Sequence, residues 1–234
     1  MAKRLLGIIA AAAALMCACS CASGKIKINN TVKEYQTDYS EVRAEIISFS
    51  GIRDEEFEQQ LNEGISKDIE GALVAFDTNA QESAGKLHMG NKCVFETDWS
   101  EKYNDKDFVS VVEERYIYMG GAHGETAWLP RNIDAAAMRE IRLADLFAEE
   151  GYVNTLNRMI NEEIQDNPEE YADLWEKPEI KDSNQTDFYI EDGDLVIFFQ
   201  PYDLSYYARG FVEFELDLEE LSGYLKEEYR RLID

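Results

Sequence analysis

Residues 93–119 read CVFETDWSEKYNDKDFVSVVEERYIYM, and this stretch decides the fold class of the chain. Cys93 and Phe95 share one face of an extended segment, while the residues next to them point to the other face. Residues 103–106 contain turn-forming Asn and Asp, and residues 108–119 are rich in β-branched and aromatic side chains. The stretch therefore predicts a β-hairpin that ends in the longest strand of the protein, with Cys93 as a half-buried core thiol.

The segments around this hairpin predict one helix and two further strands. Residues 42–49 alternate weakly between apolar and polar side chains, which predicts a strand. An apolar residue then recurs at every fourth position from Phe57 to Leu73, which predicts an amphipathic helix with Asp54 as its N-cap. After the hairpin, residues 126–133 predict another extended segment.

The second half of the chain predicts two more helices and three more strands. Residues 152–165 carry an apolar stripe of helical period, and Pro168 ends that helix. Residues 188–199 predict a hairpin that turns at an Asp-Gly pair, and residues 211–216 alternate as a strand. Asp217, with a glutamate three residues later, predicts the start of a C-terminal helix through a capping box.

The N-terminus predicts export and lipid attachment. Lys3 and Arg4 precede an uncharged apolar run at residues 5–16, and three of the four cysteines follow this run directly. A positive start, a short apolar run and small residues are typical of a secretory signal, and the run is too short for an ordinary membrane-spanning anchor. The clustered cysteines resemble a lipobox, in which Cys19 fits best as the lipidated residue and Cys21 is the alternative. We expect a protein anchored by lipid to the bacterial cell membrane, or to the outer membrane in a two-membrane cell.

Together these patterns predict an α+β fold with mostly antiparallel sheet and three main helices, folded as a single domain with two lobes. The expected boundaries are a signal peptide at residues 1–18, a lipidated tether at residues 19–34, an N-terminal lobe at residues 35–90 and a C-terminal lobe at residues 91–234.

The charge and the absence of catalytic motifs narrow the function. The net charge is −25, which repels nucleic acid and anionic lipid and attracts cationic partners; it is also explained by solubility alone. The chain has two histidines and no nucleophile elbow, zinc-binding helix or phosphate-binding loop. We therefore expect a protein that is not an enzyme and that has no catalytic residues, metal or cofactor.

Two loops carry the candidate binding residues. Residues 116–124 (YIYMGGAHG) end the long strand on aromatic residues, followed by paired glycines and a histidine. Residues 201–210 (PYDLSYYARG) combine tyrosines with an arginine, which are favoured at interfaces. Each loop also has a structural interpretation, as a braced strand-ending turn and as a closure of the core. The candidate ligand-binding residues are Tyr116, Tyr118, Gly120, Gly121, His123, Tyr202, Tyr206, Tyr207 and Arg209.

These loops and their flanking segments resemble the extracytoplasmic domain of RsiV-type anti-sigma factors. This domain of unknown function is also found in many bacterial lipoproteins and before some peptidoglycan deacetylase domains. The resemblance runs from about Tyr35 to the C-terminus, and Gly-Gly-Ala-His is its most recognisable string. Its segments are IISFSGIRDEEFEQQLNEGI (46–65), YIYMGGAHGETAWLPRNID (116–134), IRLADLF (141–147) and FYIEDGDLVIFFQPYDLSYYARG (188–210).

The resemblance implies a binding or sensing module. The family's best-understood members bind lysozyme and signal to a sigma factor through regulated proteolysis, so a lysozyme-like cationic protein or peptidoglycan is the implied ligand. In this chain a lipoprotein signal stands in place of the sigma-binding segment, and we therefore do not expect an anti-sigma role. A structural accessory protein of the envelope and an envelope hydrolase remain as alternatives.

Overall fold

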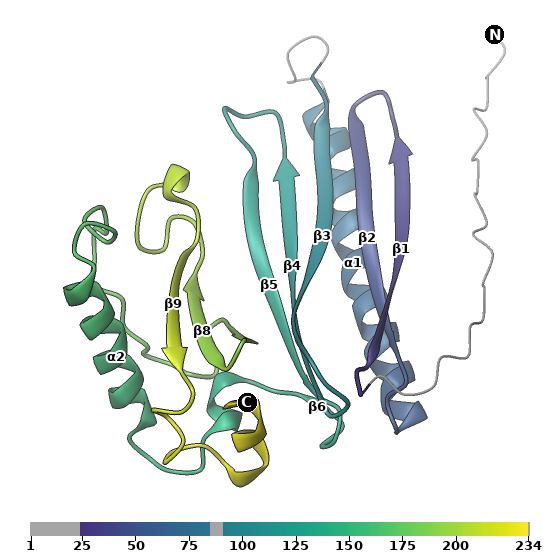
Figure 1. Ribbon diagram of the computed structural model, residues 1–234. Coiled ribbons are helices and arrows are strands. Elements are labelled where there is room, and N and C mark those ends of the chain that lie inside the picture. Colours follow the sequence, from purple (N-terminus) through teal and green to yellow (C-terminus); the bar gives the residue numbers. More distant parts are fainter. Residues whose placement is uncertain (1–23, 85–90, 234) are drawn as a thin grey trace, which may run out of the picture.

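The computed structural model describes residues 24–84 and 91–233 and has the predicted α+β fold, built on two β-sheets (Figure 1). The larger sheet contains, in spatial order, β1 (Lys27–Gln36), β2 (Ser40–Ser50), β3 (Cys93–Asn104), β4 (Phe108–Tyr118), β5 (Glu125–Asp134) and β6 (Arg139–Glu140). The smaller sheet contains β7 (Phe188–Glu191), β8 (Asp194–Phe199) and β9 (Val212–Asp217). The helices are α1 (Glu55–Ser83), α2 (Tyr152–Asp166) and the 3-10 helices η1 (Leu143–Leu146), η2 (Tyr207–Arg209) and η3 (Glu227–Ile233).

Strand pairing is antiparallel throughout both sheets except between β2 and β3, which run parallel. A parallel pair needs a long crossover connection, and α1 supplies it. The expectation of a mostly antiparallel sheet is therefore confirmed. The parallel pair of β2 and β3 is the exception among the described strands, and it is connected by α1, the helix predicted from the spacing of four.

Helix α1 forms as the sequence predicts and is longer than predicted. The Asp54 side chain accepts a hydrogen bond from the backbone N–H of Phe57 at 2.8 Å, which caps the first turn. The buried stripe continues past Leu73 and covers one face of the larger sheet, as Figure 1 shows for α1 behind β1–β3. None of the helices in the described residues is both long and apolar enough to cross a membrane.

Strand β4 lies at the centre of the fold because both of its faces are covered. Residues 108–113 are all buried, so the two-residue alternation of a half-buried strand is lost there. Val109 and Val111 pack in the same apolar cluster as the α1 stripe, whereas Val112 packs against the smaller sheet. The larger sheet is thus a middle layer between α1 and the smaller sheet.

Buried polar side chains join the two sheets across this layer. Ser110 on β4 donates to the side-chain oxygen of Asn132 at 2.6 Å and accepts the backbone N–H of Ile190 at 3.1 Å. The Asn132 amide donates to the backbone oxygen of Phe188 at 2.8 Å. Two backbone groups of β7 are therefore satisfied by side chains of the larger sheet, which fixes how the smaller sheet sits on it.

The C-terminal segment differs from the predicted α-helix. Residues 218–224 are turns, Leu225 forms an isolated antiparallel bridge with Phe147, and helical structure begins only at η3, which is of the 3-10 type. The apolar side chains expected to be buried are buried, including Leu218 and Leu232. Tyr229 of η3 is fully buried and donates to Asp134 of β5 at 2.8 Å. Tertiary contacts of this kind decide the conformation of a short segment more strongly than its capping signal does.

Two of the predicted boundaries were wrong. The tether predicted to reach residue 34 is instead strand β1 from Lys27 onward, because its backbone pairs with β2 along its whole length. The lobe boundary after residue 90 falls inside the larger sheet, since β2 and β3 pair directly. Cys93 is a free, fully buried thiol, so the core role was correct and the degree of burial was underestimated. The signal peptide (1–18), Cys19 and Cys21 lie outside the described residues.

Candidate functional site

The two candidate loops, far apart in the sequence, meet in space at one end of the molecule. The first joins β4 to β5, and the second joins β8 to β9. The His123 and Tyr207 rings are stacked, with centroids 4.4 Å apart and an interplanar angle of 15°. The Tyr202 hydroxyl lies 3.4 Å from His123 Nε2, and the Tyr202 and Tyr207 rings are 5.6 Å apart. Because the smaller sheet packs on the larger one, the hairpins that carry these loops are held side by side.

The hydrogen bonds of His123 define its tautomer. Its Nδ1 lies 2.7 Å from the backbone oxygen of Gly124, and a carbonyl oxygen only accepts. The proton of the neutral ring therefore lies on Nδ1, which leaves Nε2 to accept from the Tyr202 hydroxyl. His123 is exposed to solvent and is braced on one side by Tyr207, as its structural interpretation expects, while its role in ligand binding stays a prediction.

Glycines shape the first loop, although not at both of the expected positions. Gly120 has φ of +90°, which favours glycine, while the backbone of Gly121 lies outside this region and accepts the Tyr118 hydroxyl at 3.0 Å. The close approach occurs at Gly124, where a Cβ atom would overlap the Tyr116 ring. Tyr116 and Tyr118 thus contact the backbone of the loop, and His123 is its exposed ring.

The second loop begins with a strained turn. The Asp203 N–H donates to the Gln200 carbonyl at 3.0 Å, with proline at the second position of this turn. Tyr202 at the third position has φ of +76°, where glycine or asparagine is usual in a type II turn. Its ring is 54% exposed. This backbone conformation costs about 1–2 kcal/mol, and the exposed tyrosine gains little from burial to offset it. Such strained residues cluster at functional sites.

The remaining candidates of this loop are an exposed tyrosine, Tyr206, and a partly buried arginine, Arg209. The Tyr206 side chain is 52% exposed. Arg209 instead lies 3.6 Å from Asp173, and its Nε atom is buried. Ser205 also contacts Asp173, at 3.0 Å from the Asp173 backbone oxygen. Arg209 therefore anchors the loop to the segment after α2, and it does not offer its full guanidinium to a partner.

Trp175 belongs to the same surface and was missed by the sequence analysis. It is 56% exposed, and its backbone N–H donates to the Leu204 carbonyl at 3.0 Å. Its indole N–H donates to the Asp203 carbonyl at 3.4 Å. A tryptophan in a polar, acidic segment is the signal that could have identified it. We call the set His123, Trp175, Tyr202, Tyr206 and Tyr207 the aromatic patch.

Gln200 links this patch to the larger sheet. Its side chain accepts from the Trp128 backbone N–H at 3.0 Å and donates to the Trp128 carbonyl at 2.7 Å, as a neighbouring strand would. It also donates to Asp187 at 3.0 Å. Burial raises the pKa of Asp187, and the nearby negative charge of Asp203 adds to this, while the Gln200 bond opposes it.

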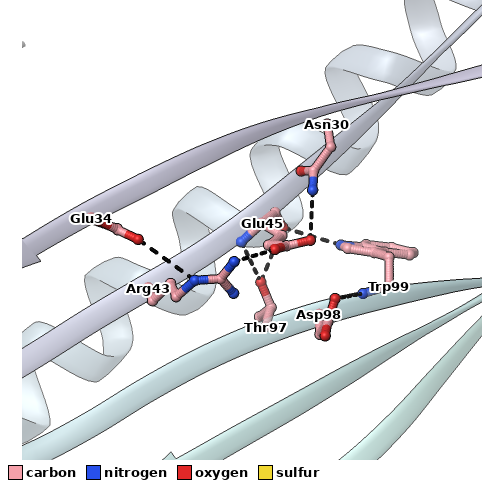
Figure 2. A network of polar contacts seen from close by, with 7 residues as sticks. All are labelled: Asn30, Glu34, Arg43, Glu45, Thr97, Asp98 and Trp99. Carbon is pink, nitrogen blue, oxygen red and sulfur yellow. Dashed lines mark hydrogen bonds and ion pairs between the residues drawn. The ribbon is translucent and has the colours of Figure 1, made fainter. Parts of the chain in front are cut away.

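A separate polar network lies on β1, β2 and β3, and Figure 2 shows that its side chains come from all three strands. Asn30 donates to the Glu45 carboxylate at 2.6 Å, and Arg43 forms an ion pair with the same group. The Thr97 hydroxyl and the Trp99 indole both donate to the Glu45 carbonyl, at 3.0 and 3.1 Å (Figure 2). The parallel pairing of β2 with β3 ends just before Glu45, so this network secures the place where the strands separate.

The aromatic patch therefore offers stacking faces and hydrogen-bonding groups more than it offers acid–base chemistry. Among the described residues, the hydrogen-bond partners of His123 are a backbone carbonyl and a phenol. Within residues 24–84 and 91–233, no three His, Cys, Asp or Glu side chains gather in a way that could hold a metal ion. Such an arrangement is suited to binding through ring contacts.

Solved structures include proteins with the same two-sheet α+β fold. A DUF3298 family member from Bacteroides fragilis NCTC 9343 superposes with a TM-score of 0.70 and 15% identity, covering 88% of this chain and 96% of that one. A DUF3298 family protein from Pseudomonas aeruginosa PAO1 superposes with a TM-score of 0.61 and 12% identity, covering 86% and 95%. The superpositions establish a shared fold, and at identities this low they establish nothing further.

Family comparisons of the sequence divide the chain into two consecutive segments. Residues 33–126 match the family described as Deacetylase PdaC, and residues 144–219 match Protein of unknown function (DUF3298). A curated relative, the peptidoglycan-N-acetylmuramic acid deacetylase PdaC of Bacillus subtilis (strain 168), is 26% identical over 146 residues. The match covers 61% of this chain and 31% of that enzyme. The chain thus combines a PdaC-like segment with a DUF3298-like segment, and it spans about a third of the curated relative's length.

Proposed function

We propose that the chain is a non-catalytic, lipid-anchored binding or sensing module of the bacterial cell envelope, whose ligand contacts the aromatic patch. The proposal rests on one observation: two loops that are distant in the sequence meet in one cluster of exposed rings. Tyr202 and His123, which are in contact there, lie 79 positions apart in the chain. Exposed aromatic side chains that are held in place by their own loops are favoured at binding surfaces. The strained conformation of Tyr202 supports the same interpretation.

Two ligands are compatible with this surface. Peptidoglycan is favoured by the likeness of residues 33–126 to the PdaC family and to part of an enzyme named for peptidoglycan deacetylation. A lysozyme-like cationic protein is favoured by the RsiV-type resemblance and by the net charge of −25. Steering by charge alone weakens steeply with salt, so the salt dependence of binding separates a specific contact from general attraction.

The proposal is tested with the full-length chain purified in detergent. We expect it to co-sediment with purified peptidoglycan, or to bind lysozyme saturably, at about 150 mM salt, where exposed charges are screened beyond roughly 8 Å. Tyr206→Ala should weaken the interaction, and Val74→Ala, on the exposed side of α1, should not. Binding to neither ligand, or equal effects of the two variants, would favour a structural accessory role.

Two further experiments address the anchor and the alternative of a hydrolase. Metabolic labelling with palmitate should mark the chain, and Cys19→Ala, more than Cys21→Ala, should abolish the label. Release of fragments from peptidoglycan that stops in a His123→Ala protein of unchanged melting temperature would contradict a non-catalytic role.

A further inference from the structure

We infer that the aromatic patch and the acidic hollow beside it bind glycan chains whose amino sugars carry free amino groups. The inference rests on the proposed function, because it names the chemical class of the ligand at the same site. It is built from three properties of the surface: its exposed rings, the carboxylates next to them, and the connection between the two.

Three rings of the patch are exposed and therefore available for contact with a ligand. In the described residues, Trp175, Tyr202 and Tyr206 are 56%, 54% and 52% exposed, so each leaves about half of its surface in water. Trp175 is bonded through Asp203 and Leu204 to the loop that carries both tyrosines. The electron-rich faces of such rings attract the C–H groups of a sugar ring as well as cations. A glycan strand offers such faces at regular intervals.

A hollow of about 270 Å³ adjoins the rings and is rich in carboxylates. Its lining contains one basic side chain, Lys181, against four acidic ones: Glu179, Asp182, Asp187 and Asp203. Burial raises the pKa of Asp187, with the charge of Asp203 as a further cause. A bound ammonium group would favour the charged carboxylate and oppose this rise.

Asp203 connects the two features. Its carbonyl accepts the Trp175 indole N–H, while its residue also lines the hollow. A ligand that stacks on the rings therefore reaches the carboxylates without leaving the surface. Among glycans, this combination selects for free amines: an acetamide in the hollow would desolvate carboxylates without neutralising them, whereas an ammonium would pair with them.

The net charge of −25 adds to this selection, because it repels glycans that carry acidic groups and attracts those that carry amines. The class of reaction that would supply the ligand is N-deacetylation of an amino-sugar polymer, in which water cleaves the acetamide to an amine and acetate. The chain would then recognise the product of such a reaction.

The test compares two probes with the same backbone, a chitosan hexamer and a chitin hexamer, by fluorescence titration of the full-length chain in detergent. We expect the chitosan hexamer to bind at least about tenfold more tightly at roughly 150 mM salt, a ratio that corresponds to about 1.4 kcal/mol. Trp175→Ala, followed by calorimetry since it removes a fluorophore, should weaken binding of both hexamers by a similar factor.

Charge variants separate a specific site from the general charge. Glu179→Gln should weaken chitosan binding severalfold and leave chitin binding unchanged. Glu82→Gln, an exposed glutamate of α1, makes the same change in net charge away from the hollow and should alter neither. Equal effects of the two variants, or equal binding of the two hexamers, would overturn the inference.

Failure of the inference and failure of the proposed function give different results. If neither hexamer binds but peptidoglycan sediments the chain in a manner that depends on Tyr206, the proposed function stands and the ligand class is wrong. If lysozyme alone binds, and Trp175→Ala abolishes this binding, the patch recognises a cationic protein and the inference is wrong. If none of the probes binds, both are wrong.

Discussion

Replacing Ser110 by alanine should strongly destabilise the protein, because its one hydroxyl group bonds two partners, Asn132 of the larger sheet and Ile190 of the smaller one. Ser110 is fully buried and Asn132 is 3% exposed, so water does not replace lost bonds there. The substitution leaves the Ile190 N–H and the Asn132 side-chain oxygen without their partner. A buried polar group left unsatisfied costs about 1–3 kcal/mol, so the expected loss is about 2–5 kcal/mol of unfolding free energy.

The measurement is urea unfolding followed by circular dichroism, with Ser100→Ala as the matched control. Ser100 is a serine of the neighbouring strand β3, is exposed and has one long hydrogen bond, at 3.5 Å to the Val112 carbonyl. We expect the control to change the unfolding free energy by less than about 0.5 kcal/mol. The double variant Ser110→Ala with Asn132→Ala should cost less than the sum of the single variants, because both break one network.

A loss for Ser110→Ala no greater than that of the control would refute the reasoning. It would mean that the smaller sheet does not depend on these bonds for its position. The aromatic patch would then be held by its loops and not by the packing of the two sheets.

Three further outcomes are expected. Tyr202→Gly should be more stable than Tyr202→Ala by about 1 kcal/mol in thermal unfolding, since both lose the ring and only glycine relieves the positive φ; the usual order, with alanine more stable, would show that the turn is unstrained. Burial raises the pKa of Glu113 above its ordinary 4.5 despite the ion pair with Arg115, so its contribution to stability is present below that value and is lost as pH rises through the raised pKa. Glu113→Gln should therefore gain stability relative to the natural chain between about pH 4 and pH 7 in urea unfolding, and a difference that does not vary with pH would contradict this. Asp54→Ala should lower the unfolding free energy by about 1 kcal/mol through loss of the cap on the Phe57 N–H. Asp54→Ser should keep most of this stability, because serine also caps helices, and equal losses in the two variants would exclude the cap as the cause.

Local patterns were sufficient for most of the secondary structure. The spacing of four predicted α1 and the Asp-Gly pair predicted the β7–β8 hairpin, because each pattern reports which face of a single element is buried. The same rule failed for β1, whose side chains are mostly exposed because it forms the outer edge of the sheet. An edge strand is stabilised by backbone pairing with its neighbour, and its own sequence carries little sign of this.

The candidate site could be predicted only in part. Tyrosines, glycines and a histidine in two loops marked both halves of the site, and the structure brings them into contact. Sequence could not separate rings that point outward from a residue that braces the loop, which is why Arg209 was included and Trp175 was not. Exposure depends on what packs against a side chain, and Arg209 is covered by a segment that lies far from it in the sequence.

By itself, the sequence determined most of the local conformations: which segments form strands and helices, with β1 and the C-terminal segment as exceptions, where they turn, and which residues carry rings and charge. Such features depend on interactions within a few residues of chain. Only the tertiary structure decided that the smaller sheet lies on the larger one, that His123 stacks on Tyr207, and that Trp175 bonds to Asp203, which lines a hollow rich in carboxylates. These arrangements follow from buried contacts between distant segments, such as that of Ser110 with Ile190, whose pairing no local pattern specifies.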